Sequence, residues 1–489
     1  MAALDDLRGA WLGAQQRLAA AATPDWDACA AVIDAADALG RGMGAELPHW
    51  HHPLPLGPGL DATEIRQAPA WRWLAEADLK LKLFIAGMWS EACQQAAISP
   101  EAPTEAAFGA WATALDGAFA RMVAHPGYTE QQTVWLRAAL DCGLDLTPAC
   151  PPMPLAPPLG QSPKDEVWRD GLVSLWRYRG GGELGPLLIV HGVIGRQSVT
   201  DLEPQRSLVG DLTRAGADVW TLDWGNPTGA ERDLGFTDYA EGWVGQAIQI
   251  LEAETGRRPA LLGICQGGIF VLAQAARHPE RVAGIALTGT PVDFHADRGG
   301  QEGYLNRLAR SLPEDVVDGL ISRRGVLPGA LTGALFQAMT PGRTFAKYTI
   351  GAMRRAREPG ALATFARMEA WLADRPDLPA RAAREWLISL YRRNALVRGR
   401  FEVAGATVEL GRITCPVLNI VADHDHIVPP ACSRALAEHV PRAPYRLVAV
   451  PTGHIGVFVS RKAEAVVAPA LADWLGEISR RPDGNRRAI

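Results

Sequence analysis

Short apolar runs that alternate with helix-like stretches constrain the fold of this chain more than any other feature. Nearly continuous runs of this kind, bounded by Gly, Pro or Asp, suit strands that are buried on both faces of a sheet. The helical stretches between them supply the crossovers of a parallel sheet. The sequence therefore predicts an α/β fold. The runs cover residues 172–178, 186–192, 218–224, 260–268, 282–290, 415–423 and 445–454.

The chain of 489 residues is too long for one ordinary core, so we expect more than one domain. Residues 1–146 are rich in Ala, with apolar positions spaced as in helices, and predict an all-helical N-terminal domain. Residues 147–163 hold seven prolines and predict a linker. Residues 164–480 then form the α/β domain, interrupted at about 295–400 by a helical lid. We expect residues 481–489 to be a disordered tail.

The helical domain also holds eight of the 16 tryptophans. Tryptophans at helical spacing are usually core residues, but they are also candidates for an interface. The cluster from His49 to His52 lies between prolines without a matching distant set of ligands, so it favours a surface turn over a metal site. The eight tryptophans are residues 11, 26, 50, 71, 73, 89, 111 and 135.

Composition excludes several classes of protein. The net charge of −5 gives no reason to expect a nucleic-acid partner. The seven cysteines are scattered and contain no CxxC pair, so neither a disulfide framework nor a structural zinc site is expected. No apolar run is long enough to span a bilayer, and the N-terminus lacks the pattern of a secretory signal. We expect a cytoplasmic enzyme without a transmembrane segment or a metal.

The segment GICQGG has the form G-x-C-x-G, running from Gly263 through Cys265 to Gly267. It joins an apolar run to a helical stretch, as in the nucleophile elbow of α/β-hydrolases, where one reactive side chain stands at a sharp turn. A thiol at a helix N-terminus ionises readily, because the helix dipole favours the thiolate. The segment predicts that Cys265 is a covalent nucleophile; taken alone it would also suit a buried core cysteine.

An elbow nucleophile needs an acid and then a base later in the chain. The run that ends at 423 leads into DHDHIVPP, and the last run delivers His454. We assign His454 as the base and Asp425 as the acid, since Asp425 lies beyond the strand end. Asp423 is the alternative acid and suits a role in capping the loop.

Two backbone N–H groups are expected to form the oxyanion hole. One belongs to Gln266, the residue after the nucleophile, and the other is assigned to Val193 in the HGV segment after the second run. His191 in that segment is interpreted as structural.

The chain from about residue 165 to 475 resembles the poly(3-hydroxyalkanoate) synthases. The resemblance rests on GICQGG, on the segments 196–227 and 365–420, and on the motifs DHIVPP and GHIGVF. It maps the family's triad onto Cys265, Asp425 and His454. The chain departs from the family in the loop HGVIGRQ, where Gln197 follows the arginine in place of the family's usual proline. The resemblance therefore does not fix the oxyanion loop or the acyl preference.

The resemblance implies that 3-hydroxyacyl-CoA is polymerised into a polyester, with CoA released through an acyl-cysteine intermediate. It implies no cofactor, because CoA is part of the substrate, and it implies association with polyester granules. We also expect a homodimer. Residues 111–140 resemble the C-terminal part of the separate helical subunit of two-subunit synthases, so the N-terminal domain is interpreted as a fused accessory subunit.

Two other functions remain open from the sequence. One is a thioesterase or polyester depolymerase on the same scaffold. The other is a non-catalytic protein of the granule surface whose helical domain is the working part.

Overall fold

A computed structural model describes residues 104–144, 146, 158–298, 303–348 and 360–480, with single positions between 77 and 95 and at 355 and 358. These residues divide into two compact units. The α/β unit lies within 150–336 and 353–489, and the helical unit within 1–149 and 337–352. Several predictions lie outside the described residues: the His49–His52 turn, the linker before residue 158, the tail 481–489 and tryptophans 11, 26, 50, 71, 73 and 89.

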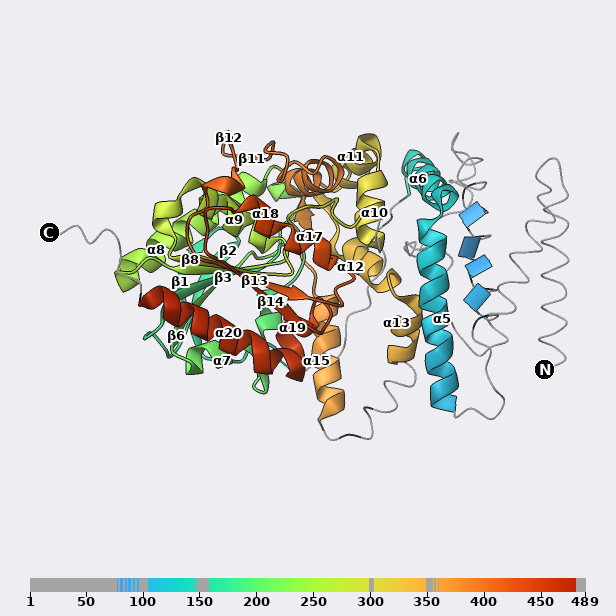
Figure 1. The fold of residues 1–489 in the computed structure, drawn as a ribbon. Coiled ribbons are helices and arrows are strands. Elements are labelled where there is room, and N and C mark those ends of the chain that lie inside the picture. Colours follow the sequence, from blue (N-terminus) through green and yellow to red (C-terminus); the bar gives the residue numbers. More distant parts are fainter. Residues whose placement is uncertain are drawn as a thin grey trace, which may run out of the picture. The chain divides into compact units, whose positions relative to one another are not determined.

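The α/β unit is built on one sheet with the strand order β1-β2-β6-β3-β7-β8-β13-β14 (Figure 1). The six strands from β6 to β14 run parallel. The strands are Lys164–Asp170 (β1), Val173–Tyr178 (β2), Gly185–Val190 (β3), Ala217–Asp223 (β6), Ala260–Ile264 (β7), Gly284–Thr288 (β8), Val417–Ala422 (β13) and Tyr445–Val450 (β14).

The predicted α/β fold is confirmed, and each of the apolar runs overlaps one strand of the sheet. The sheet is mostly parallel, as predicted, and departs from this at one edge, where β2 pairs antiparallel with both β1 and β6. Strand β1, KDEVWRD, was not predicted. It lies at the edge of the sheet and is mostly exposed, so it has no apolar run to mark it.

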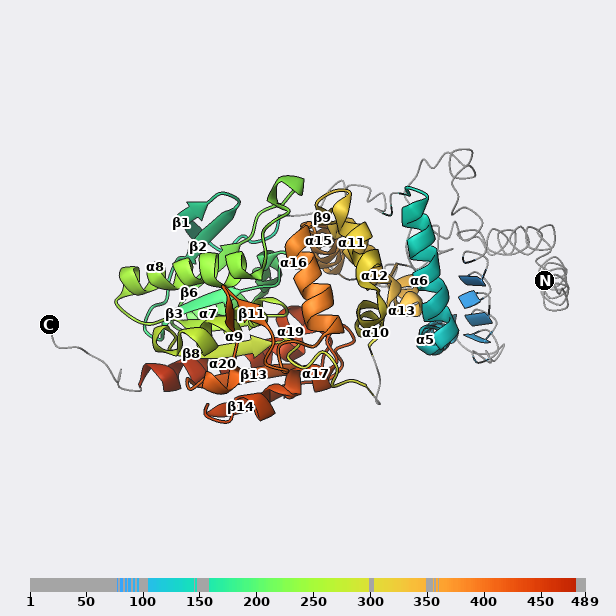
Figure 2. The ribbon, with the colours of Figure 1, turned by 90° about the horizontal axis from the view of Figure 1, so that it is seen from above.

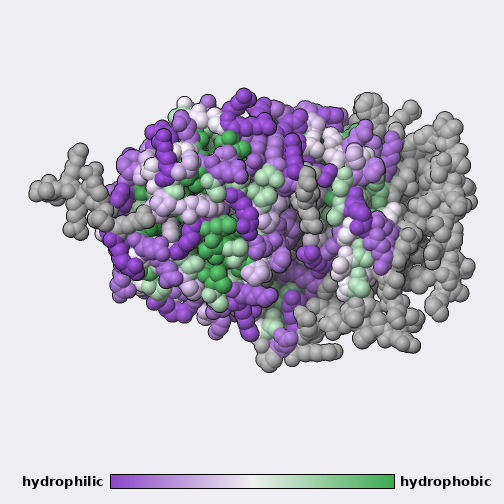
Figure 3. Space-filling model, in the orientation of Figure 1, coloured by the Kyte–Doolittle hydropathy of each residue, from purple (hydrophilic) through white to green (hydrophobic). Residues whose placement is uncertain are grey.

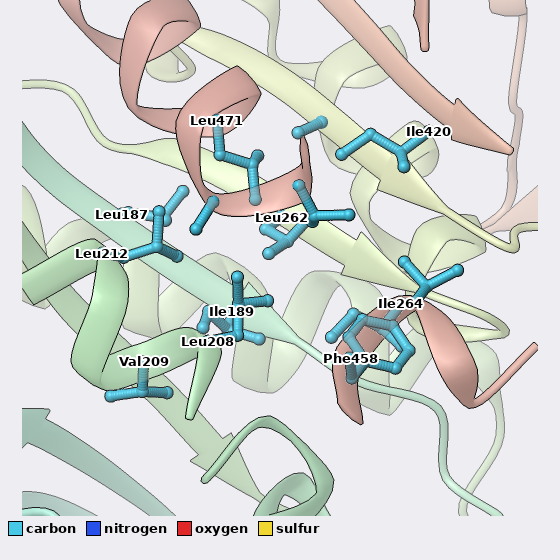
Figure 4. Packing of buried hydrophobic residues seen from close by; sticks show 14 of the residues in the cluster. Leu187, Ile189, Leu208, Val209, Leu212, Leu262, Ile264, Ile420, Phe458 and Leu471 are labelled. Carbon is cyan, nitrogen blue, oxygen red and sulfur yellow. The ribbon is translucent and has the colours of Figure 1, made fainter. Parts of the chain in front are cut away.

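Helices cover both faces of the sheet, with α7 and α20 on one side and α8 and α9 on the other (Figure 1). The core on the α7 side contains Leu212 of α7 and Leu471 of α20, which pack with Ile189, Leu262 and Ile420 of the sheet (Figure 4). These side chains are fully buried. The helices of the two faces and of the C-terminal part are Leu208–Arg214 (α7), Gly245–Thr255 (α8), Gly267–Arg277 (α9), Pro430–Arg434 (α17), Leu436–His439 (α18), Gly456–Val459 (α19) and Arg461–Ser479 (α20).

The interval between β8 and β13 is mainly helical, and its helices α10, α11, α12, α15 and α16 gather at one end of the sheet (Figure 2). The elements are Tyr304–Ser311 (α10), Glu314–Ser322 (α11), Val326–Leu327 (β9), Gly329–Ala338 (α12), Ala361–Ala373 (α15), Leu378–Pro379 (β10), Ala380–Arg384 (α16) and the π-helix Glu385–Arg392 (η5). Strands β9 and β10 pair with each other. We call these elements the lid.

Short elements complete the α/β unit. They are Gln197–Thr200 (η1), Asp201–Glu203 (β4), Arg206–Ser207 (β5), Gly229–Glu231 (η2), Asp238–Val244 (η3), Pro279–Arg281 (η4), Glu402–Val403 (β11), Ala406–Thr407 (β12) and Leu410–Arg412 (η6).

The described helices of the helical unit are Thr104–Ala124 (α5), Pro126–Asp141 (α6) and Pro341–Tyr348 (α13). His125 separates α5 from α6, and its ring nitrogen accepts a hydrogen bond from the Gly127 N–H at 3.1 Å. Trp135 of α6 is buried, as expected of a core tryptophan. Segment 337–352 comes from the interval that the sequence assigned to the lid, yet it folds with the helices of the N-terminal part.

A carboxylate of α5 holds the N-terminus of α13. Asp116 accepts a hydrogen bond from the Gly342 N–H at 2.8 Å, and its second oxygen lies 3.2 Å from Nε of Arg343. The two helices approach closely, since a methyl group at Gly342 would lie 2.0 Å from the carbonyl oxygen of Ala112. Burial raises the pKa of Asp116, while the two donors act in the opposite direction.

The edge of the sheet at β14 carries exposed apolar side chains. Apolar residues gather in the region of β14 on the face shown in Figure 3, and Leu447 of this edge strand is 40% exposed. None of the described helices is both long enough and apolar enough to cross a membrane.

Candidate active site

Cys265 stands at the turn between β7 and α9 with a backbone φ of 53°. Residues with a Cβ atom rarely adopt this conformation, and it persists only where the surrounding structure enforces it. Here the Cys265 N–H donates to the Thr288 carbonyl of the neighbouring strand β8 at 2.9 Å. The strained turn presents the side chain of Cys265 at the end of the sheet, which is the geometry of a nucleophile elbow.

Three glycines around Cys265 allow this turn to exist. A methyl group at Gly263 would lie 2.5 Å from the Cα of Gly268, and one at Gly267 would lie 2.0 Å from the carbonyl oxygen of Val190. A methyl group at Gly268 would meet the Thr290 hydroxyl at 2.0 Å. No larger residue fits at these positions, so the glycines of the G-x-C-x-G segment are explained by close packing of strand and helix.

Asp425 and His454 form a buried pair. The distance between Oδ2 of Asp425 and Nδ1 of His454 is 2.6 Å. The other carboxylate oxygen, Oδ1, accepts hydrogen bonds from the N–H groups of Ile427 at 2.9 Å and Val428 at 2.8 Å. Both oxygens of Asp425 are therefore held, and its carboxylate fixes the orientation of the imidazole.

Besides Asp425, the Cys265 side chain raises the pKa of His454, through its negative charge and as a hydrogen-bond partner. Burial disfavours the charged imidazolium, but the negative charges of Asp425 and Cys265 outweigh it and hold the pKa of His454 well above its ordinary value. The imidazole can thus take the thiol proton and keep it while the thiolate reacts. The structure brings together the three residues that the sequence assigned to the triad.

The alternative acid, Asp423, is exposed at the end of β13 and pairs with Arg434 at 2.7 Å. His424 and His426 are also exposed in this loop. The geometry therefore favours Asp425 as the partner of His454.

The loop after β3 lies against the elbow, since a methyl group at Gly192 would be 3.4 Å from the backbone N of Gln266. Gln266 and Val193 are both buried in this region. His191 is buried as well, and its Nδ1 lies 2.6 Å from the Gly192 carbonyl oxygen. Burial lowers the pKa of His191 to about 4, so this ring is neutral at pH 7 and suits a structural role.

Gly289 is a further part of the site that the sequence analysis did not identify. Its φ is 55°, and a methyl group there would lie 2.8 Å from Cε1 of His454. Gly289 thus gives the imidazole the space that it needs beside Asp425. The feature of the sequence that could have identified Gly289 is the small-residue segment TGT, which ends the run 282–290.

Within the part of the chain that the structure describes, no group of three or more His, Cys, Asp or Glu residues is placed to hold a metal ion. The chemistry available at the site is that of a thiol, an imidazole and a carboxylate. This set is suited to acyl transfer through a covalent intermediate.

Comparisons with known proteins agree with this geometry. Residues 185–460, more than half of the chain, match the model of the alpha/beta hydrolase fold family. The poly(3-hydroxyalkanoate) polymerase subunit PhaC of Allochromatium vinosum is 36% identical over 324 residues, which cover 65% of this chain and 89% of that protein. The chain belongs to the poly(3-hydroxyalkanoate) polymerase family. The subunits PhaC of Thiocystis violacea and Synechocystis are each 33% identical, covering 65% of this polymerase-family chain and 90% and 85% of their own lengths.

The family assignment confirms the resemblance seen in the sequence. It also shows how much of this family member the relatives account for. They span 65% of its length, so about a third of the chain is not covered by these subunits.

Proposed function

We propose that this chain polymerises 3-hydroxyacyl-CoA into a polyester and releases CoA. The observation that carries the proposal is the buried pair of His454 and Asp425 together with Cys265 at the strained elbow, in a member of a family whose relatives are named poly(3-hydroxyalkanoate) polymerases. No cofactor is required, because the CoA thioester itself supplies an activated acyl group.

In the first half of the cycle, His454 takes the proton of the Cys265 thiol and the sulfur attacks the thioester carbonyl. The tetrahedral oxyanion accepts hydrogen bonds from the N–H groups assigned to Gln266 and Val193. The C–S bond to CoA then breaks, and His454 returns the proton to the leaving sulfur. The products are free CoA and an acyl group on Cys265.

In the second half, a hydroxyl group attacks the acyl-cysteine. His454 takes the hydroxyl proton, an oxoester forms, and the Cys265 thiol is regenerated with that proton. Asp425 stabilises the charged imidazolium in both halves. A thiol nucleophile suits this cycle, because exchange between two thioesters is nearly isoenergetic and formation of the oxoester then drives polymerisation.

Polymerisation requires that water be kept from the acyl-cysteine while an apolar product leaves. The lid helix α12 carries the largely apolar segment GALTGALFQA, which supports a role in guiding the polyester to the granule surface. The unpaired edge of β14, with exposed Leu447, supports association into a homodimer, since such an edge is a template for a second strand. We place the enzyme in the cytoplasm, at polyester granules.

Product analysis tests the proposal. The purified protein is incubated with 3-hydroxybutyryl-CoA, and free CoA, soluble 3-hydroxybutyrate and insoluble polymer are measured together. We expect CoA and polymer in equivalent amounts. CoA with soluble acid would identify a thioesterase or depolymerase, and no CoA release above that of buffer would identify a non-catalytic granule protein.

The helical unit is proposed to be the accessory subunit, fused to the catalytic part. Two observations support this: residues 111–140 resemble that subunit, and α13, which comes from the lid interval, packs on α5 in the same compact unit. Deleting residues 1–145 removes α5 and α6 and should lower the rate of CoA release or lengthen the lag before polymer appears. Full activity without a longer lag would refute the fusion.

A further inference from the structure

The end of lid helix α15 holds the loop that follows β3 through three polar contacts. Trp371 donates from Nε1 to the Arg196 carbonyl oxygen at 2.9 Å. The Arg196 guanidinium forms an ion pair with Asp374 at 2.8 Å. Arg375 donates from Nη1 to the Ile194 carbonyl oxygen at 3.3 Å. Residues 194–196 directly follow the proposed oxyanion donor Val193, so a lid segment fixes the loop beside the nucleophile.

Arg375 differs from the other charged groups of this contact. Among the described residues no carboxylate pairs with its guanidinium. The charge instead lies 4.7 Å from the ring centre of Phe336 and 5.9 Å from that of Trp371, and Nε donates to the Leu372 carbonyl oxygen at 3.0 Å. Aromatic faces stabilise a cation but leave its net charge uncompensated.

The packing around Arg375 leaves a defined space for its side chain. A methyl group at Gly333 of α12 would lie 3.0 Å from Cδ of Arg375, so a glycine makes room for this side chain. Burial lowers the pKa of Arg375 to about 10, and the negative charge of Cys265 opposes that change. The guanidinium therefore remains charged at pH 7. The loop that it holds lies against the elbow, since a methyl group at Gly192 would be 3.4 Å from the backbone N of Gln266.

We propose that Arg375 is a positioning residue for acyl transfer, which holds the oxyanion loop through Ile194 and thereby keeps a positive charge near the elbow that favours the Cys265 thiolate. A partly buried cation without a carboxylate partner is costly. Its cost falls when the thiolate forms, because the two opposite charges attract each other. The same attraction favours the thiolate before substrate attack. This inference rests on the proposed cysteine chemistry but not on the identity of the acyl acceptor.

The first test measures the thiolate directly. The rate of Cys265 alkylation by iodoacetamide is followed from pH 5 to 10 in the full-length protein and in Arg375→Met, with the alkylated residue identified by mass spectrometry. Loss of the cation should move the half-maximal pH upward by about one unit. Arg375→Lys keeps a charge and should restore most of the original profile. The control is Arg179→Met, which removes an exposed arginine paired with Asp165.

The second test measures catalysis through CoA release from 3-hydroxybutyryl-CoA. In Arg375→Met, kcat should fall about 10- to 100-fold with KM changed less than about threefold, since the loop contact acts on the transition state. Arg375→Lys should recover the alkylation profile but not kcat, because an ammonium group does not reproduce both the ring stacking and the Ile194 contact. Trp371→Phe, which removes one N–H donor to the loop, should lower kcat about tenfold with an unchanged alkylation profile.

Two results would overturn the proposal. One is an Arg375→Met protein with the alkylation profile and kcat of the original chain. The other is an equal loss in Arg375→Met and Arg375→Lys in both assays. Should Arg375→Met not fold, Arg375→Lys and Trp371→Phe still separate charge from loop contact, and a normal kcat in both would refute the role. The alkylation assay needs no substrate, so failure of the proposed polymerase activity would be seen separately.

Discussion

The two compact units hold their important residues in different ways. In the α/β unit, Cys265 lies in a strained backbone turn, and close packing leaves no room for a side chain at the glycines around it. In the helical unit, α13 is held by Asp116 at its N-terminus and by close packing of Gly342 on Ala112. Cys265 is thus fixed by the sheet, whereas a segment of the lid interval is fixed by helices from the other end of the chain. Changes in the first unit should affect chemistry, and changes in the second should affect stability and regulation.

The largest effect is expected from Cys265→Ala. Without the thiol no acyl-enzyme forms, so CoA release from 3-hydroxybutyryl-CoA should fall by more than about 1,000-fold. Mass spectrometry of the protein after incubation with substrate should show no acyl adduct. Cys142→Ala, at the end of α6 in the helical unit, is the matched control and should keep full activity. A stable acyl adduct on the Cys265→Ala protein would contradict the assigned nucleophile.

Asp425→Asn should have the next largest effect. The amide no longer stabilises the imidazolium of His454, and kcat should fall about 100- to 10,000-fold. Asp423→Asn is the matched control from the same loop, since Asp423 is exposed and paired with Arg434; it should change kcat less than about twofold. Equal losses in both variants would reverse the choice of acid.

The same Asp425→Asn variant makes a prediction about stability and pH. The pKa of His454 is raised in the folded protein, so the native state binds this proton more tightly than the unfolded chain does. That stabilisation is complete below pH about 6.5, the ordinary histidine value, and is lost as the pH rises through the raised value. The destabilisation caused by Asp425→Asn, measured by denaturant unfolding, should therefore shrink between pH 6 and 9. A constant or growing difference would argue against the charged pair.

Gly289→Ala tests the space beside His454. Gly289 and Gly171 both have a φ of 55°, but a methyl group at Gly171 meets nothing within 4 Å. Both alanine variants should lose about 1–2 kcal/mol of unfolding free energy from backbone strain. Only Gly289→Ala should also displace the imidazole and lower kcat, by about 10- to 100-fold. Similar activities in the two variants would show that contact with His454 does not matter.

Gly342→Ala tests the helical unit and should have the smallest effect on chemistry. A methyl group there meets the backbone of α5, so α5 and α13 must separate, at a cost of about 1–3 kcal/mol of unfolding free energy. Cys265 alkylation should be unchanged. Gly109→Ala on α5 is the control, since nothing lies within 4 Å of the added methyl group. Loss of thiol reactivity in Gly342→Ala would show that the site depends on the helical unit.

The sequence predicted the parts of the site that follow local rules. The elbow around Cys265 is defined by residues adjacent in the chain, and Asp425 and His454 follow from the order of strands in such sheets. Gly289 was missed because a larger residue there would collide with the imidazole of His454, which is distant in the sequence. Arg375 was missed for a similar reason, since its contact with Ile194 depends on the path of the lid.

The fold shows the same distinction between local and distant causes. Buried parallel strands such as β3 and β7 are marked by apolar runs, whereas β1 is a polar edge strand that is recognised only through its partner β2. Helix α13 has an ordinary helical sequence, and nothing in it tells which unit it joins. Its membership depends on Asp116, which lies 226 residues before Gly342.

That long separation affects how the protein is made. Ribosomes add about 5–20 residues per second, so Gly342 leaves the ribosome on the order of 10–45 seconds after Asp116. During this interval the nascent α5 presents the Ala112 backbone and the Asp116 carboxylate without their native neighbour. Translation past α13 is thus the step that allows Gly342 to pack on Ala112 and completes the helical unit.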